Sequence, residues 1–278
     1  MKHIRNLALP LFAALFIVSS CGTPKPTASA PKAGKSGSGL SEQEQINATY
    51  AFFDAQKEKV SGNDQRALEL FAQCLRIDTK NHAAMYEMAS IYNAKGKVND
   101  ALFFAKSASD LDPKNEWYQL LLANTYEKSG KFTEAISIYQ QLYKKYPDRV
   151  EYLFSESDAL LMQGKLQEAI KVYDVIEKEI GVTREMTQQK QRLYLKMGKV
   201  NEAAGELEKL IQSDPDNMDN YSLLVELWQV NGKSDKAMET IQRMKAIDPE
   251  NPSIALALAE QYRSEGKRAE SFEELKKA

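Results

Sequence analysis

The chain has 278 residues, with 37 basic and 39 acidic side chains, two histidines and two cysteines. Its net charge of −2 gives no support to nucleic-acid binding, which needs a basic surface to neutralise phosphates. Two cysteines cannot form a disulfide framework, and two histidines leave little for histidine-based catalysis or metal binding.

The first 20 residues have the features of a secretory signal. Lys2, His3 and Arg5 precede an apolar stretch from Leu7 to Val18. Its twelve residues are fewer than the roughly 18–20 that a membrane-spanning helix needs, which disfavours the alternative of a transmembrane anchor.

This stretch ends in Val18-Ser19-Ser20-Cys21, which resembles the lipobox of bacterial lipoproteins. In that family the cysteine thiol carries diacylglycerol and the signal is cut just before it. The resemblance implies a signal peptide at 1–20, a lipid anchor at Cys21, and a place in the bacterial envelope, at the outer membrane facing the periplasm. Val-Ser-Ser is a less typical form of the motif, so an ordinary secreted protein with a cysteine after its cleavage site is the alternative.

Residues 21–40 are rich in Pro, Gly, Ser, Ala and Lys and contain no aromatic residue. Such a segment cannot bury enough apolar surface to offset the entropy of ordering, so it predicts a flexible tether. Its root-mean-square reach would be roughly 25 Å. A helix is expected to begin after it, where Ser41 and Glu44 form a capping box.

A 34-residue period fills the rest of the chain. Seven glycines share one register: Gly62, Gly96, Gly130, Gly164, Gly198, Gly232 and Gly266. Positions are counted below from the glycine of each unit. Position +5 is Ala in six units, position −7 is mostly small, position −4 is mostly aromatic and position +17 is mostly Pro. Glycine caps a helix in the left-handed conformation, small side chains let two helices approach closely, and proline ends the second helix.

These columns resemble the tetratricopeptide repeat, a helix–turn–helix unit of 34 residues. The resemblance implies an all-α fold, a right-handed superhelical solenoid of about seven helix pairs over 41–278. The units are expected near 48–81, 82–115, 116–149, 150–183, 184–217, 218–251 and 252–278.

Three units depart from the pattern, the first of them by carrying Glu58 where an aromatic residue is usual. In the fifth unit Thr187, Lys190 and Gln191 occupy positions that are elsewhere mostly apolar or small, and an unpaired buried Lys190 would be costly. We therefore expect loose or rotated packing there and the most deformable part of the solenoid around 180–195. In the seventh unit no polar capping helix follows, so Phe272 and Leu275 should be partly exposed.

The first helix of each pair lines a concave groove in tetratricopeptide proteins, so the resemblance directs attention to positions −13, −10 and −6. These columns supply apolar and aromatic residues in the first four units and acidic residues further along, with Arg192 as the exception. The candidate groove residues are Phe52, Tyr86, Trp117, Leu120, Asn124, Phe154, Asp158, Glu185, Arg192, Asp219 and Glu226. Such a groove would suit a partner segment with apolar anchors and basic residues. The alternative is that the aromatics pack between pairs and the acids are solvated.

No catalytic constellation, metal site, cofactor site or small-molecule substrate site is predicted. Cys74, in a helical apolar context, is expected to be a small buried residue, and His82 is expected at the surface or in a helix cap. The sequence therefore indicates a membrane-anchored scaffold or adaptor that binds envelope proteins, and no enzyme. The alternative is the N-terminal docking region of a longer protein whose further part carries a separate activity.

Overall fold

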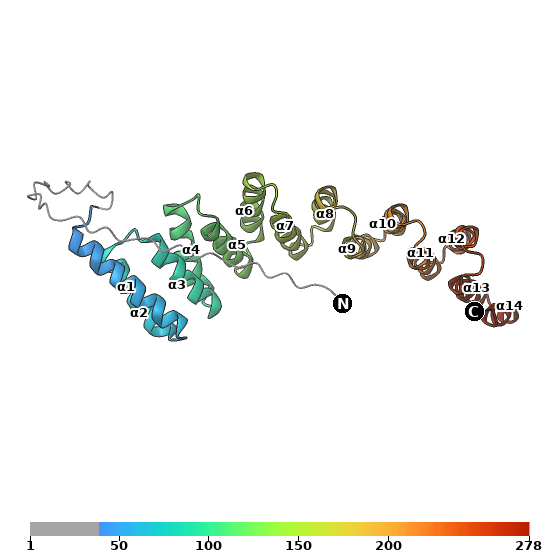
Figure 1. The fold of residues 1–278 in the computed structure, drawn as a ribbon, viewed down its shortest axis with the longest axis horizontal. Helices are drawn as coiled ribbons and strands as arrows, with labels where there is room; N and C mark the ends of the chain where they lie inside the picture. The colour runs from blue at the N-terminus through green and yellow to red at the C-terminus, as the bar shows by residue number, and fades with distance from the viewer. Residues whose placement is uncertain (1–38, 278) are drawn as a thin grey trace, which may run out of the picture. The chain divides into compact units, whose positions relative to one another are not determined.

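The computed structural model describes residues 39–277 (Figure 1). The predicted signal peptide, Cys21 and nearly all of the predicted tether lie outside the described residues. Over the described range the secondary structure is fourteen α-helices without a strand. These are α1 (Glu42–Val60), α2 (Asp64–Ile77), α3 (His82–Ala94), α4 (Val98–Leu111), α5 (Glu116–Lys128), α6 (Phe132–Lys145), α7 (Glu151–Met162), α8 (Leu166–Ile180), α9 (Arg184–Lys196), α10 (Val200–Ser213), α11 (Met218–Val230), α12 (Ser234–Ile247), α13 (Pro252–Ser264) and α14 (Arg268–Leu275).

Each odd-numbered helix packs against the even-numbered helix that follows it, and each pair contacts the next pair along the chain. The predicted all-α arrangement of seven helix pairs is confirmed. The predicted capping box is also present, because the Ser41 side chain accepts from the backbone N–H of Glu44 and the Glu44 side chain accepts from that of Ser41. Among residues 39–277 no helix combines the length and the apolar character that crossing a membrane requires.

The period of 34 is built around the turn inside each pair. All seven glycines of the register have φ between 68° and 79°, the left-handed conformation that glycine adopts without steric cost. The N–H of the residue after each glycine donates to the carbonyl oxygen at position −4, as in Lys131 to Tyr126 at 2.8 Å. This bond satisfies a carbonyl that the end of the first helix leaves free.

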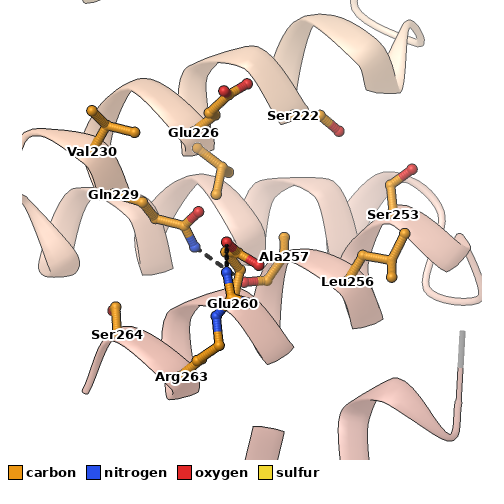
Figure 2. Close-up of a pocket in the computed structure, with 11 residues that line it drawn as sticks. Ser222, Glu226, Gln229, Val230, Ser253, Leu256, Ala257, Glu260, Arg263 and Ser264 are labelled. Carbon is orange, nitrogen blue, oxygen red and sulfur yellow. Dashed lines mark hydrogen bonds and ion pairs between the residues drawn. The ribbon is translucent and has the colours of Figure 1, made fainter. Parts of the chain in front are cut away.

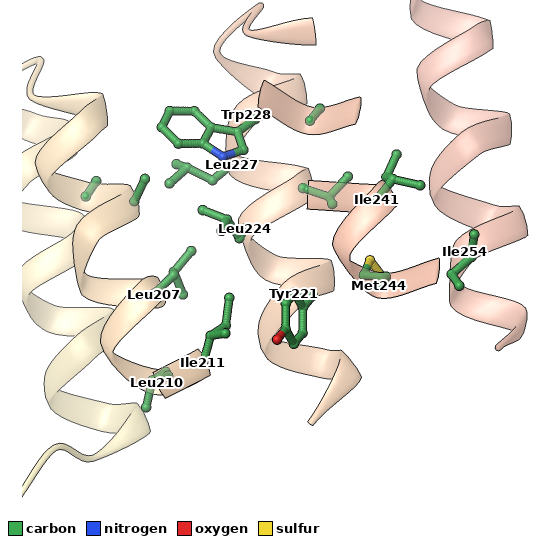
Figure 3. Close-up of a cluster of buried hydrophobic side chains, with 14 residues drawn as sticks. Leu207, Leu210, Ile211, Tyr221, Leu224, Leu227, Trp228, Ile241, Met244 and Ile254 are labelled. Atoms are coloured by element: carbon green, nitrogen blue, oxygen red, sulfur yellow. The ribbon is translucent and has the colours of Figure 1, made fainter. Parts of the chain in front are cut away.

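Small side chains at positions −7 and +5 hold the two helices of a pair together. Alanine at +5 is fully buried in all six units that carry it, and Ser271 in the seventh unit is 7% exposed. The backbones can approach closely at these points, and larger side chains fill the space around them. In the cluster that joins α10, α11 and α12, for example, Leu207, Leu224 and Met244 are fully buried (Figure 3).

The surroundings of Cys74 and His82 can be compared with the expectations from the sequence. Cys74 is buried as expected, and burial, aided by the charge of Asp78, raises the pKa of its thiol to about 11. His82 differs from the expectation. The cap of α3 is Asn81, and the half-buried His82 ring lies 2.8 Å from the Tyr118 hydroxyl of the next pair. A half-buried imidazole needs such a partner, and the long tyrosine at position −12 of the next unit supplies it.

We expected loose packing because a buried Lys190 would be unpaired, and that assumption is wrong. Lys190 is fully buried, but its Nζ lies 2.5 Å from Asp174, 2.9 Å from Glu177 and 2.9 Å from Glu206. Burial alone would lower the pKa of Lys190, but the hydrogen bonds that its ammonium group donates to these carboxylates outweigh burial and raise that pKa. α9 is therefore held between α8 and α10 by a buried cation among carboxylates. Greater deformability around 180–195 stays a prediction.

The turn glycine can be tested against a glycine inside a helix. We expect Gly130→Ala to lower the free energy of unfolding by about 1 kcal/mol, because its φ of 74° disfavours a side chain. Gly205 lies within α10, lacks a positive φ and has nothing within 4 Å of an added Cβ. Gly205→Ala should therefore raise the free energy of unfolding by about 0.5–1 kcal/mol. Urea denaturation followed by circular dichroism measures both; equal effects would contradict this explanation.

The Lys190 cluster yields a second prediction. Lys190→Met should lower the free energy of unfolding by roughly 2–3 kcal/mol, because Glu177 and Glu206 would stay buried with the partly exposed Lys209 left to pair with them. Lys171→Met on the exposed side of α8 is the matched control and should change it by less than about 0.5 kcal/mol. If both variants unfold like the unaltered protein, the cluster does not stabilise α9.

Candidate partner-binding groove

A cavity of about 620 Å³ lies between α11 and α13, the first helices of the sixth and seventh pairs. Its apolar walls come from Val225 and Val230 on α11 and from Leu256 and Ala257 on α13. Figure 2 shows the side chains of the two helices around this space. A cavity of this size matches the volume that a few side chains of a bound segment would fill.

Polar groups line the same cavity. Glu226 projects from α11 without an ion-pair partner among the described residues, whereas Glu260 on α13 forms an ion pair with Arg263 (Figure 2). The Gln229 side chain donates to the backbone oxygen of Ala257 at 3.1 Å, which links the two helices across the cavity floor. A bound segment would therefore meet apolar walls and at least one available carboxylate.

The three columns chosen from the sequence converge on this cavity. Ser253 stands at position −13, Ser222 and Leu256 at −10, and Glu226 and Glu260 at −6, and all five line it. Sequence reasoning missed positions −3 and −2, which contribute Gln229, Arg263, Val230 and Ser264. Extending the same helix face by one more turn from position −6 would have found them.

Two aromatic candidates of the first units are engaged in packing. Phe52 is half-buried and lies edge-on to the fully buried Phe71, with ring centroids 5.6 Å apart. Tyr86 is also half-buried and packs on Tyr118 of the next pair at 5.1 Å. The Phe52 ring therefore packs within the first pair, and the Tyr86 ring packs between the second pair and the third. A role of either ring in partner binding stays a prediction.

The remaining candidates of units three and four are more open. Trp117 is 65% exposed and Phe154 is 37% exposed. Leu120 is half-buried against the apolar cluster that contains Leu122 and Tyr139. Asn124 accepts a hydrogen bond from Asn93 at 3.0 Å. An aromatic ladder open to solvent in these units therefore reduces to Trp117 and Phe154.

Negative charge also gathers on α5 and α7. Partial burial raises the pKa of Asp158 at position −6 of unit four. Burial likewise raises the pKa of Glu127 at position −3 of unit three, and the charge of Asp158 adds to this effect. Glu127 was not predicted from the sequence, because position −3 was not considered. The two carboxyl groups would be relieved by a cation from a partner.

The candidates of the later units are solvent-exposed. Glu185, Arg192, Asp219 and Glu226 all lie on the first helices α9 and α11 with exposed side chains. Of these four, Glu226 borders the cavity. The Nε of Arg192 donates to the backbone oxygen of Gln188 within its own helix at 3.3 Å.

Comparison with known proteins agrees with this geometry. Models of the tetratricopeptide repeat match residues 61–125, 120–180 and 194–262. The chain belongs to the tetratricopeptide repeat family. A comparison with the sequences of curated proteins gives no significant match.

Solved structures with the same repeats are similar over much of the chain. One is a tetratricopeptide repeat protein from Parabacteroides merdae ATCC 43184, with 18% identity, a TM-score of 0.51, and 84% of this chain and 92% of that chain covered. Another is MamA AMB-1, with 19% identity, a TM-score of 0.50, and 62% of this chain and 93% of that chain covered. At these identities the likeness concerns the fold.

Tetratricopeptide repeats bind proteins or peptides on a surface assembled from consecutive repeats, and they typically carry no catalytic activity. The geometry between α11 and α13 is of this kind, because two neighbouring repeats supply the walls. Within residues 39–277 no cluster of three or more His, Cys, Asp or Glu side chains could hold a metal ion. Binding of a protein segment is thus the chemistry that this site offers.

Proposed function

We propose that this tetratricopeptide repeat protein is a lipid-anchored scaffold or adaptor of the bacterial cell envelope. It would hold a segment of another envelope protein in the groove formed by the first helices of its repeats. The observation that carries the binding part is the cavity of about 620 Å³ between α11 and α13, which positions −13, −10 and −6 line together.

The chemistry of the groove defines the segment that would fit. Val225, Val230 and Leu256 offer apolar contacts, while Glu226 has no ion-pair partner among the described residues. On α5 and α7, Glu127 and Asp158 form no ion pair among the described residues, and burial raises the pKa of each carboxyl group. A segment with apolar anchors and lysine or arginine side chains would satisfy both regions.

The anchor rests on the sequence of the N-terminal residues. A short apolar segment followed by Val18-Ser19-Ser20-Cys21 has the order that lipoprotein processing requires. Several acyl chains on one residue would give stable membrane attachment, where a single chain would be marginal. A tether of residues 21–40 would let the repeats search a few tens of ångströms from the outer membrane, on its periplasmic face.

The anchor is tested by Cys21→Ala. The unaltered protein should be found in the membrane fraction, and the variant should move to the soluble fraction because it cannot be acylated. Ser20→Ala keeps a small residue before the cysteine and is the matched control. Membrane fractionation of the Cys21→Ala variant like that of the unaltered protein would refute the lipid anchor and leave the groove proposal intact.

The groove is tested by photo-crosslinking in the native envelope. A photoreactive residue in place of Ser222, which lines the cavity, should capture a partner protein, and Glu226→Lys in the same chain should reduce the yield several-fold by repelling a basic segment. Glu239→Lys on the exposed side of α12 is the matched charge control and should leave the yield unchanged.

A second photoreactive position outside the groove completes the test. Phe103 on α4 is 66% exposed, does not line the cavity and should not capture the same protein. Equal capture from residues 103 and 222, or capture that ignores Glu226→Lys, would contradict a groove-bound basic segment.

A further inference from the structure

At position −12, α1 exposes a side chain whose counterparts are buried in every later unit. At position −12 the side chains are Ala84, Tyr118, Tyr152, Met186, Asn220 and Ile254, each no more than 7% exposed. Tyr50 holds this position in the first unit and is 68% exposed. Ile46 and Phe53 beside it are 41% and 63% exposed. The three residues form an apolar patch, called here the α1 face, which also borders a shallow cavity.

The contacts between consecutive pairs show what normally covers position −12. It meets position −14 of the preceding unit in three places. Tyr118 meets His82 at 2.8 Å, Tyr152 donates to Glu116, and Asn220 accepts from Arg184 at 2.9 Å. It also packs on position −10, as the Tyr118 ring does on Tyr86. The surface that buries this position is therefore the first helix of the preceding pair.

A second contact joins position −8 to position +10 of the preceding unit. Glu156 accepts from Gln140 at 2.7 Å in one case, and Lys190 donates to Asp174 at 2.5 Å in the other. A third contact joins position −9 to positions −6 and −3, where Glu87 accepts from Gln56 at 2.8 Å and also from Lys59. Each contact pairs groups of complementary chemistry.

The last pair that the structure describes exposes the counterpart of the α1 face. Leu256 at position −10 is 52% exposed, and Phe272 and Leu275 on α14 are 61% and 51% exposed, as their sequence positions predicted. Lys276 stands at position +10, with its side chain 55% exposed and in a solvent-exposed ion pair with Glu273 at 2.7 Å. These residues and the adjoining side of α13 are called here the α13–α14 face.

We propose that the α1 face of one copy docks on the α13–α14 face of a second copy, so that the repeats continue from one chain into the next. The repeat register then assigns the contacts. Tyr50 would pack on Pro252 and Leu256, Phe53 would lie against the aliphatic part and guanidinium of Arg263, and Asp54 would pair with Lys276. All three pairings are complementary, and Asp54–Lys276 places opposite charges where Lys190–Asp174 does within the chain.

The charges favour this occupant over a symmetric one. Head-to-tail docking gives each Asp54 a lysine at the position that the repeat register assigns, whereas the contacts within the chain offer no counterpart for two α1 faces packed on each other. A head-to-tail contact uses different surfaces on the two copies and therefore generates chains unless rotation closes a ring. The contact shares Leu256 and Arg263 with the wall of the cavity between α11 and α13. It does not rest on the proposed envelope function.

Charge reversal tests the pairing. For the full-length purified protein in one detergent, sedimentation velocity should show an average mass that rises with concentration. Asp54→Lys and Lys276→Glu should each raise the dissociation constant by about tenfold or more, because each places like charges together. An equimolar mixture of the two variants should associate as the unaltered protein does, since every end then meets an opposite charge.

The controls use exposed charges outside both faces. Glu239→Lys and Lys144→Glu make the same charge changes and should associate like the unaltered protein. Circular dichroism should show equal helix content in all variants. A protein that stays monomeric at every concentration would overturn the proposal. Loss of association in Asp54→Lys alone would indicate symmetric α1 contacts and would overturn it too.

Discussion

The close approach of the two helices in each pair is the constraint on which the rest of the structure depends. It is made possible by small side chains at position +5 and, in most units, at position −7, and the alanines at +5 are fully buried in every unit that has one. It also requires a tight turn between the two antiparallel helices, which the glycines provide by adopting the left-handed conformation. Because every pair has this same arrangement, the first helices of neighbouring pairs lie side by side. Residues 34 apart in sequence, such as Ser222 and Leu256, can therefore line one cavity.

Much of the fold could be predicted because this constraint recurs every 34 residues and fixes the residue type at the same positions of most units. The glycine and alanine columns identify the two helices and the turn, and the exposure of Phe272 and Leu275 follows from the place of their helix in the stack. The groove columns were also predictable, since spacing along a helix decides which side chains share a face. Positions −3 and −2 were missed because the same face of the first helix was considered only as far as position −6.

Sequence could not predict contacts that depend on which residue faces which across two pairs. Lys190 looked like an unpaired charge because its partners Asp174 and Glu177 lie in the preceding unit and Glu206 in the following helix. Phe52 and Tyr86 looked like open groove residues for the same reason, because the packing of Phe71 and Tyr118 against them is not visible in their own column. Counting positions across consecutive units, as −8 against +10, would have related Lys190 to Asp174.

The contacts between pairs also explain how similar repeat units stack in one defined order along the chain. The apolar columns recur in every unit and would allow almost any two pairs to stack. Polar pairs are specific: Gln140 with Glu156 and Asp174 with Lys190 occupy the same two positions in consecutive junctions but differ in chemistry. A buried charge that meets the wrong partner costs several kcal/mol, which is a larger penalty than misplaced apolar side chains incur. The periodic apolar columns therefore stabilise the stacking of helix pairs, while the polar pairs select which surface packs on which within one chain. By the same rule, Asp54 and Lys276 would select the contact between two chains.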